Sequence, residues 1–321
     1  MNFDPILIIN GEPNSVFSEL FFKSLKNLKV NKPIILISSY RLLKLQMKKL
    51  NYNFSIKLLD ENNLNSYKLN NKSINLINIE YNQKKAFDKI SKKSKNFIKS
   101  SFSLAFKLIK EKKITKVING PISKKHFLEN KYLGITEYIS KHFLKKNTCM
   151  LIFNKELSVS TITTHLPLKL VTKNINKKII KDKIKLIDKF YINQFNIKPR
   201  IGVLGLNPHC ESIHKFNEDD KIIKPVINRM KSLGYKISGP HSADTIFLKK
   251  NRKNFDIIIG MYHDQVLTPI KTIYEYDAIN ITLGLPFIRI SPDHGPNEKM
   301  LGKNSSNALS LMKAIKFFEK H

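Results

Sequence analysis

The sequence predicts an α/β protein, and three observations support this fold class. Short apolar segments rich in Ile, which are typical of buried strands, alternate along the chain with longer segments of helical periodicity. The chain has 321 residues, which is enough for one large domain or two subdomains with a sizeable core. Its hydrophobic content is 41%, with 20 Phe and 11 Tyr, and this composition excludes a wholly disordered chain.

Each element follows from its own pattern of apolar residues. Continuous apolar runs predict buried strands, and apolar residues that repeat every three or four positions predict helices. The helix over 94–112 is typical, because Phe97, Phe102, Phe106 and Ile109 fall at spacings that suit one face. The same criteria predict strands over 5–11, 32–39 and 116–120 and helices over 18–28, 180–191 and 305–320, the last capped by Ser305 or Ser306.

The cysteines and the apolar segments exclude several classes of protein. Cys149 and Cys210 provide neither a disulfide framework nor a Cys-x-x-Cys metal motif. The start, MNFDPILIING, has no basic leader of the kind that signal peptides carry. No apolar stretch approaches the roughly 18 residues that a membrane helix needs. We therefore expect a soluble, cytoplasmic protein without a membrane partner.

The positive charge of the chain is unusually high, with 57 Lys and Arg against 25 Asp and Glu and a formal net charge of +32. Such a charge raises nucleic acid as a partner, because neutralised phosphates supply most non-specific affinity. However, Lys is spread along the whole chain among Asn and Ile, which share A/T-rich codons. No zinc-finger spacing and no RNA-binding aromatic motif occurs. We therefore expect that a biased genome composition explains the high positive charge, and we expect no specific binding of nucleic acid.

Three predicted strands each end in a histidine. The segments LSVSTITTHLPL, RIGVLGLNPHCE and FDIIIGMYHDQ lead into His165, His209 and His263. If these strands are parallel neighbours, the imidazoles could converge beyond the carboxyl ends of the strands, where open α/β sheets bind ligands. Three imidazoles suit a divalent metal and leave positions open for a substrate. The alternative is three unrelated histidines that cap or pack locally.

Polar side chains near these histidines extend the candidate site. Asp264 and Gln265 follow His263 and are expected to orient its imidazole through the second ring nitrogen. Asp244 of SADTIF is either a site carboxylate or a turn residue. No Walker loop, Gly-x-Gly-x-x-Gly fingerprint or Gly-x-Ser-x-Gly elbow occurs.

Further along the chain, Lys271, Asn280 and Arg289 suit a phosphate-bearing substrate, with Arg able to bind it through two hydrogen bonds. In a chain with 57 basic residues, the alternative for any single Lys is a solvated surface position.

Together these segments resemble 4-hydroxythreonine-4-phosphate dehydrogenase, an enzyme of pyridoxal phosphate biosynthesis. The resemblance rests on TTHLPL, LNPH, GPHSADTIF, MYHDQVLTPIK and NITLGLPFIR…DHG in that order, with NGPISK upstream. It implies an isocitrate/isopropylmalate-dehydrogenase-like α/β/α fold with two subdomains around a central cleft. Residues 1–125 with 285–321 would form the cofactor side, and residues 126–284 the metal, substrate and dimer side. It also implies a homodimer with the active site at the subunit interface.

The resemblance implies the reaction and the roles of individual residues. NAD or NADP and one divalent metal ion, such as Zn, Mg or Co, would support oxidation and decarboxylation of 4-hydroxythreonine 4-phosphate to 3-amino-2-oxopropyl phosphate. Lys271 and Asp244 are both candidates for the group that removes the hydroxyl proton. The implied residues are His165, His209 and His263 for the metal; Thr136, Lys271, Asn280 and Arg289 for the substrate; Asp244 and Asp264 for catalysis or support of the ligands; and Asp293, His294 and Gly295 for the cofactor.

Several loops depart from the family pattern. Ile135 stands where the family has a substrate-binding histidine, so one polar contact is lost. The amino-terminal loop GEPNSVFS lacks two family glycines, and the loop DHGPNEKMLGK contains Pro296, which has no backbone donor. We expect either a divergent enzyme with the same activity or a dehydrogenase for another phosphorylated hydroxy acid of the threonate or erythronate type. A third alternative is a non-catalytic relative that binds metal or nucleic acid.

Overall fold

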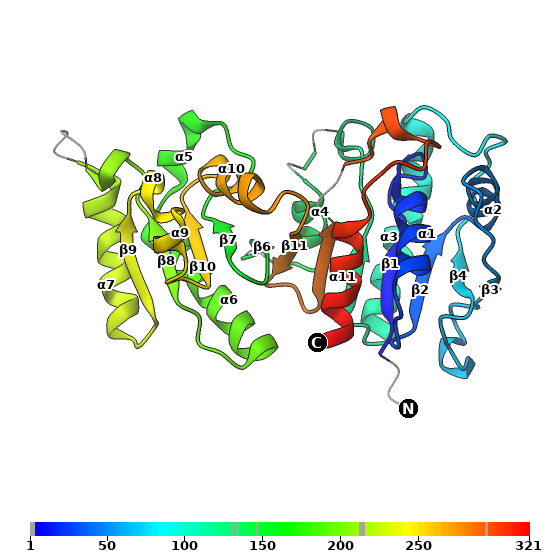
Figure 1. Ribbon diagram of the computed structural model, residues 1–321, viewed down its shortest axis with the longest axis horizontal. Coiled ribbons are helices and arrows are strands. Elements are labelled where there is room, and N and C mark those ends of the chain that lie inside the picture. The colour runs from blue at the N-terminus through cyan, green and yellow to red at the C-terminus, as the bar shows by residue number, and fades with distance from the viewer. Residues whose placement is uncertain (1–3, 130, 133, 146, 212–215, 293–294) are drawn as a thin grey trace. The chain divides into compact units, whose positions relative to one another are not determined.

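A computed structural model of the chain divides it into two compact units (Figure 1). Unit 1 comprises Met1–Ile139 and Pro286–His321, and unit 2 comprises Ser140–Leu285. Strands and helices alternate in both units, so the predicted α/β class is confirmed. The assignment of a cofactor side and a metal and substrate side stays a prediction. The structure describes residues 4–129, 131–132, 134–145, 147–211, 216–292 and 295–321.

The strands of unit 1 are parallel and lie in the order β3-β4-β2-β1-β5-β12. The central strands are continuous apolar runs because helices cover parallel sheets on both faces. Every residue of β1 and β2 is buried accordingly. The bounds are β1 Ile6–Ile9, β2 Ile34–Ser38, β3 Ile56–Leu58, β4 Ile74–Asn78, β5 Lys116–Asn119 and β12 Ile288–Pro292.

The helices of unit 1 bury the apolar faces that the sequence predicts. The helix α3 packs on β1 and β2, and its Phe97, Phe102, Phe106 and Ile109 are all buried. The carboxyl-terminal helix α11 packs on β5 and β12. The bounds are α1 Phe17–Asn27, α2 Tyr40–Lys49, α3 Lys95–Glu111 and α11 Leu309–Lys320, with shorter helical turns at Leu64–Ser66, Lys92–Ser94, Lys124–Leu128 and Glu298–Met300. The helix α4, Ile135–His142, begins in unit 1 and ends in unit 2.

The strands of unit 2 lie in the order β11-β6-β7-β10-β8-β9. The strands β7, β10, β8 and β9 are parallel, whereas β6 and β11 are antiparallel to their neighbours. The three strands that lead into histidines are β7, β8 and β10. They are parallel neighbours, which is the condition under which the three imidazoles could converge. The bounds are β6 Cys149–Phe153, β7 Ser158–Thr161, β8 Ile201–Leu204, β9 Ile237–His241, β10 Ile257–Gly260 and β11 Ile279–Leu283.

The helices of unit 2 connect these strands. The helix α6 packs on β6 and β11, and its Ile180, Ile184, Ile187 and Tyr191 are buried, as the sequence predicts. The helix α10 packs on β7 and β10. The bounds are α5 Leu168–Asn174, α6 Lys177–Phe195, α7 Lys224–Ser232, α8 Ala243–Ile246, α9 Lys249–Arg252 and α10 His263–Tyr274, with turns at Pro208–Cys210 and Asp219–Ile223. No helix in the part of the chain that the structure describes is both long and apolar enough to cross a membrane.

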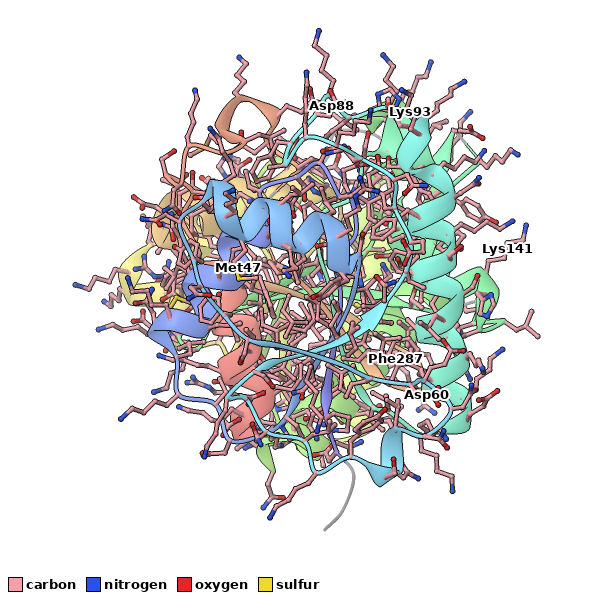
Figure 2. The ribbon with its side chains drawn as sticks, turned by 90° about the vertical axis from the view of Figure 1, so that its right-hand side faces the viewer. Met47, Asp60, Asp88, Lys93, Lys141 and Phe287 are labelled. Carbon is pink, nitrogen blue, oxygen red and sulfur yellow. The ribbon has the colours of Figure 1, made fainter. Side chains whose placement is uncertain are left out.

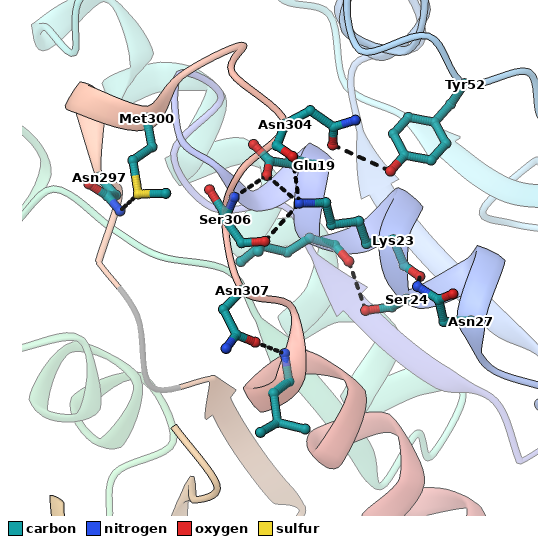
Figure 3. A network of polar contacts seen from close by, with 12 residues as sticks. Glu19, Lys23, Ser24, Asn27, Tyr52, Asn297, Met300, Asn304, Ser306 and Asn307 are labelled. Atoms are coloured by element: carbon teal, nitrogen blue, oxygen red, sulfur yellow. Dashed lines mark hydrogen bonds and ion pairs between the residues drawn. The ribbon is translucent and has the colours of Figure 1, made fainter. Parts of the chain in front are cut away.

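The predicted serine cap of α11 is wrong, and Figure 3 shows why. The backbone N–H of Ser306 donates to the buried carboxylate of Glu19 on α1. Lys23 ion-pairs with the same carboxylate at 2.8 Å and donates to the carbonyl oxygen of Ser306 at 2.8 Å. Asn307 instead accepts a hydrogen bond from the N–H of Leu309 at the start of the helix. The serine therefore attaches the segment before α11 to α1 rather than capping the helix.

Two glycines permit a close approach of two loops at the carboxyl ends of β1 and β5. A Cβ atom on Gly120 would lie 2.1 Å from the carbonyl oxygen of Asn10 and 2.7 Å from the Phe17 ring. Gly11 has φ +77°, and a Cβ there would lie 2.5 Å from the carbonyl oxygen of Pro121. Only glycine fits such a backbone contact without displacement of the loops.

We predict that Gly120→Ala destabilises unit 1, because the added methyl group collides with backbone that cannot move independently. The expected loss in the free energy of unfolding is about 3 kcal/mol, typical of overpacked sites. Gly295→Ala is the matched control, since a Cβ at Gly295 meets nothing within 4 Å. Urea denaturation of both variants measures the difference, and equal stabilities would contradict the loop contact.

Candidate functional site

The carboxyl ends of β7 and β10 are held together by backbone hydrogen bonds that continue past the strands. The N–H of Ile162 donates to the carbonyl oxygen of Gly260 at 2.8 Å. The backbone N–H and the hydroxyl of Thr163 both donate to the carbonyl oxygen of Met261, at 3.1 and 2.7 Å. The residues that follow each strand are therefore fixed relative to one another.

This arrangement brings His165 and His263 together. Their ring centroids are 5.6 Å apart, with 36° between the ring planes. Two imidazoles on one tetrahedral metal ion would have centroids about 5 Å apart, given metal–nitrogen distances of about 2.0–2.1 Å. His165 has φ +50°, in the left-handed region that non-glycine residues seldom adopt. The pair is suited to bind a divalent metal.

Asp264 contacts His263 as the sequence predicts. Its Oδ1 lies 2.6 Å from Nδ1 of His263, so the ring can donate from Nδ1 and keep Nε2 available for a ligand. Gln265 does not orient the imidazole. It accepts a hydrogen bond from the N–H of Met261 at 2.7 Å and donates to the carbonyl oxygen of Gly205 at 2.8 Å, so it links the ends of β10 and β8.

His209 lies on the loop after β8, and the structure does not bring it together with the other two histidines. It is exposed and has φ +54°. The buried carboxylate of Asp219 shapes this loop, since it accepts from the N–H of Leu206 at 2.7 Å and from that of Asn207 at 3.1 Å. Among the described residues, no group of three His, Cys, Asp or Glu side chains is placed to hold a metal.

Asp244 and Cys210 lie near His209. Asp244 is an exposed residue in the first turn of α8, and its charge acts on the Cys210 thiol. Burial, followed by the charge of Asp219, raises the pKa of Cys210, which disfavours the thiolate that a nucleophile requires. This environment suits packing of the Cys210 side chain rather than a nucleophilic role.

Two predicted substrate residues lie elsewhere in unit 2. Lys271 is exposed on α10, the helix that begins with His263. Asn280 is on β11, paired with Ile152 of β6. The Oδ1 atom of Asn280 is buried and accepts no hydrogen bond from the described residues. A buried acceptor in this state is suited to a ligand that supplies a donor.

The other two predicted substrate residues, Arg289 and Thr136, are in contact within unit 1. Arg289 on β12 is 1% exposed. Its Nε donates to Oδ1 of Asn119 at 2.6 Å, and its Nη1 donates to Oγ1 of Thr136 at 3.1 Å. Asn119, at the end of β5, also donates to the carbonyl oxygen of Gly120 at 2.9 Å, which fixes the amide that orients the guanidinium.

The electrostatic setting of Arg289 is unusual for an arginine. Burial lowers the pKa of its guanidinium to about 10, and the nearby carboxylate of Glu137 opposes this shift. Glu137 is in the first turn of α4, next to Thr136. A buried cation of this kind is suited to bind a phosphate or carboxylate group of a ligand.

The amino-terminal loop of unit 1 is organised by Glu12, which is fully buried. Its carboxylate accepts hydrogen bonds from the Ser94 hydroxyl at 2.9 Å and from the N–H of Asn14 at 3.3 Å. Burial raises the pKa of Glu12 to about 7. The Asn14 side chain continues the connection, because it exchanges hydrogen bonds of 2.9 and 3.0 Å with the Gln83 amide.

A hollow of about 610 Å³ lies beside Asn14 in unit 1. Figure 2 shows two of its lining residues, Asp88 and Lys93, at the same end of this unit. Tyr81 and Phe97, whose ring centroids are 5.2 Å apart, both line it. Lysines outnumber carboxylates in the lining, which gives it a positive charge suited to anionic groups. The lysines are Lys84, Lys85, Lys89 and Lys93, and the carboxylates are Glu80 and Asp88.

The predicted cofactor residues are described only in part. Asp293 and His294 lie outside the described residues. Gly295 is described and exposed, and the next residue, Pro296, accepts a hydrogen bond from the N–H of Val16 at 3.1 Å. This bond joins the DHG loop to the amino-terminal loop that contains Glu12 and Asn14.

Comparison with known proteins identifies the family. Residues 29–318 match the family described as pyridoxal phosphate biosynthetic protein PdxA. The chain belongs to the PdxA family. It is 37% identical to a 4-hydroxythreonine-4-phosphate dehydrogenase of Sulfurihydrogenibium sp. (strain YO3AOP1), over 97% of this chain and 96% of the relative. A protein of the same name from Wigglesworthia glossinidia brevipalpis is 41% identical over 64% of this chain and 63% of its own.

Solved structures agree with membership of the PdxA family. A 4-hydroxythreonine-4-phosphate dehydrogenase from Klebsiella pneumoniae superposes with a TM-score of 0.85 at 25% identity, over 99% of this chain and 98% of that chain. A terephthalate 1,2-cis-dihydrodiol dehydrogenase from Burkholderia xenovorans LB400 superposes with a TM-score of 0.66 at 18% identity, over 99% and 98% of the two chains, and shows the shared fold alone. The fold is thus a mixed α/β fold of the kind that PdxA structures have, and the chain functions in pyridoxal phosphate biosynthesis.

Sequence reasoning missed several residues that shape these sites. Asn119 and Asp219 hold Arg289 and the His209 loop through hydrogen bonds. Glu137 directly follows Thr136 in the sequence, and this position was the one signal that could have found it. The lining of the hollow has no sequence signal, since its lysines look like any others in a chain with 57 basic residues.

We predict that Glu12 makes stability depend on pH in a defined direction. Its folded pKa of about 7 lies above its ordinary value of 4.5, so between these values the folded chain keeps a proton that the unfolded chain loses. The free energy of unfolding therefore falls as pH rises through this window. The full effect is on the order of 3 kcal/mol.

The test compares the wild type with Glu12→Gln by urea denaturation between pH 5 and pH 8. The wild type should lose stability relative to the variant as pH rises. Glu61→Gln is the control, because Glu61 forms a partly exposed ion pair with Lys107 at 3.0 Å. A stability difference between wild type and Glu12→Gln that is constant across pH would show that Glu12 titrates normally.

Proposed function

We propose that this protein oxidises 4-hydroxythreonine 4-phosphate with NAD or NADP and releases carbon dioxide, which yields 3-amino-2-oxopropyl phosphate for pyridoxal phosphate biosynthesis. The observation that carries the proposal is the buried Arg289 guanidinium, oriented by Asn119 and Thr136, in a chain 37% identical to a dehydrogenase of that name. A fixed, desolvated guanidinium is suited to an anionic substrate. We also propose that the fold is of the isocitrate/isopropylmalate-dehydrogenase type, with two subdomains.

Substrate recognition is assigned to four side chains of complementary chemistry. Arg289 and Lys271 supply positive charge for the phosphate and carboxylate groups. Thr136 supplies a hydroxyl, and the buried Oδ1 of Asn280 supplies an acceptor that the described residues leave unused. Each of these groups is assigned a contact that helps to orient the substrate for hydride transfer. Lys271 and Asp244 remain the two candidates for removal of the hydroxyl proton, and both are exposed in the single chain.

The metal ligands are assigned to His165, His209 and His263. Support comes from the 5.6 Å separation of the His165 and His263 rings and from the Asp264 contact with His263. When bound, a divalent ion supplies Lewis-acid polarisation of the substrate hydroxyl. We further propose a homodimer with the active site at the subunit interface. A ligand set divided between two subunits does not require one chain to hold all three histidines together.

The cofactor is assigned to unit 1. The hollow beside Asn14 supports this assignment, because its lysines suit phosphate groups and Tyr81 suits a ring. The hydrogen bond from Val16 to Pro296 ties the amino-terminal loop to the DHG loop, where Asp293, His294 and Gly295 are the proposed cofactor residues.

Ile135 favours a second candidate function. It begins α4 directly before Thr136, at the position of the family's substrate-binding histidine, and it offers no hydrogen bond. Loss of that contact suits an enzyme for another phosphorylated hydroxy acid, such as a threonate or erythronate phosphate. The two functions predict different preferred substrates.

A substrate panel separates the two functions. We expect purified protein supplied with Zn, Mg or Co to reduce NAD or NADP with 4-hydroxythreonine 4-phosphate, followed by absorbance of the reduced nicotinamide. We expect turnover with threonate and erythronate phosphates to be at least tenfold slower. Reduction with the hydroxy acids alone would establish the second function, and the same reactions with metal removed by a chelator test the metal requirement.

We predict that Asp264→Asn weakens metal binding by about 10–100-fold, because the carboxylate that fixes the His263 ring is lost. His263→Ala removes a ligand and should abolish metal-dependent turnover while leaving the protein folded. Calorimetric titration with zinc measures the metal affinity of each variant, and absorbance of the reduced nicotinamide measures its turnover. Asp182→Asn, which disrupts a surface ion pair with Lys178, serves as the control. Unchanged zinc affinity in His263→Ala would remove His263 from the metal site.

A further inference from the structure

Gln265 uses both ends of its side-chain amide to join two strands of unit 2. Its Oε1 atom accepts a hydrogen bond from the backbone N–H of Met261 at 2.7 Å, just beyond β10. Its Nε2 atom donates to the carbonyl oxygen of Gly205 at 2.8 Å, just beyond β8. Met261 lies shortly before His263 in the sequence, and Gly205 lies shortly before His209. One side chain therefore connects the backbone that leads into both histidines.

Capping of α10 accounts for only half of this bridge. Gln265 is at the third position of α10, where a Glu or Gln side chain commonly accepts a backbone N–H at the start of the helix. The bond from Met261 is of this kind. The bond to Gly205 is different, because it requires a side-chain donor and joins residues 60 positions apart. An ionised glutamate would serve the cap but has no hydrogen to donate to a carbonyl oxygen.

The loop that follows β8 needs support from outside itself. His209 and Cys210 have φ of +54° and +62°, in the left-handed region, and such backbone persists only where the surrounding structure holds it. Gly205 anchors the start of this loop through both of its backbone polar groups. Its N–H donates to the carbonyl oxygen of His241 at 3.0 Å, and its carbonyl oxygen accepts from Gln265.

Met261 connects the same bridge to His165. Its carbonyl oxygen accepts hydrogen bonds from the backbone N–H and the hydroxyl of Thr163, which comes shortly before His165 in the sequence. Its N–H donates to Gln265. The backbone of Met261 is therefore held on one side by the loop after β7 and on the other by the side chain that reaches β8.

We propose that Gln265 is a positioning residue of the metal site, which fixes the loop that carries His209 relative to the backbone before His263. The inference rests on the proposed function, in which these histidines bind the metal. Ligands that are held in place before binding lose less conformational freedom, so the bridge raises metal affinity. It serves equally in a homodimer with shared sites, because each chain then presents its His209 loop to the partner in the position that Gln265 fixes.

The test uses two substitutions that separate the bridge from the helix cap. Gln265→Glu keeps an acceptor for Met261 and loses the donor to Gly205, whereas Gln265→Met keeps neither and adds no charge. Amide hydrogen exchange of the metal-free protein reports both bonds. We expect exchange over 206–211 to become about tenfold faster in both variants, as suits the loss of one hydrogen bond. The N–H of Met261 should stay protected in Gln265→Glu and lose its protection in Gln265→Met.

Metal affinity is measured by calorimetric titration with zinc. It should fall about 10–100-fold in Gln265→Met, the range typical of residues that support metal ligands. Bound cobalt gives a second readout, since its visible absorption spectrum reports the number and geometry of its ligands. We expect this spectrum to change in Gln265→Met, which a loss of stability alone does not produce.

Gln194→Met is the matched control. Gln194 is near the carboxyl-terminal end of α6, from which the chain enters β8 at the end of the strand opposite to His209. Its substitution should leave exchange over 206–211, zinc affinity and the cobalt spectrum unchanged. Unchanged exchange over 206–211 or unchanged zinc affinity in Gln265→Met would overturn the inference alone. A wild type that binds no zinc would instead overturn the proposed metal site, and the inference with it.

Discussion

The burial of Arg289 is the constraint that determines which residues must surround it. A guanidinium that is 1% exposed cannot rely on water, so hydrogen bonds from the protein must replace its solvation. Asn119 does so at 2.6 Å and is itself fixed by Gly120, whose missing side chain lets the loop reach Asn10. The position of the cation thus depends on a backbone contact between the ends of β1 and β5. The placement of the charge proposed to bind the substrate therefore depends on how these two loops pack.

Unit 2 positions its polar residues by a different device. Parallel strands end at one edge of the sheet, and backbone bonds past β7 and β10 carry the alignment into the loops. His165 and His263 come together because Thr163 and Met261 are joined directly. His209 depends instead on Asp219, a carboxylate that lies after the histidine in the sequence but shapes the backbone before it. The single chain therefore positions His165 and His263 through one shared set of bonds and His209 through a separate one.

The sequence predicted the helices and strands whose apolar residues follow a regular pattern. Apolar periodicity identified α3 and α6 with their buried faces, and the apolar runs before the histidines identified β7, β8 and β10 as strands, which are parallel neighbours in the structure. No element could be predicted for residues 51–93, because Asn and Lys interrupt the apolar pattern there. This region contains β4 and most residues that line the hollow. Contacts between residues far apart in the chain, such as Asn119 with Arg289, have no local pattern, so only the folded chain reveals them. The serine cap of α11 failed for the same reason, because Glu19 takes the N–H of Ser306.

The departures from the family pattern are consistent with one another when seen in the fold. Val16 lies in the amino-terminal loop that lacks two family glycines, and its N–H donates to the carbonyl oxygen of Pro296 in the altered DHG loop. Proline lacks a donor but keeps its acceptor, so this pair uses the group that the substitution preserves. Asn14 in the same loop uses its side chain to hold Gln83 at the edge of the hollow. In the described part of these loops, one backbone bond and one pair of side-chain amides thus supply contacts near the proposed cofactor site.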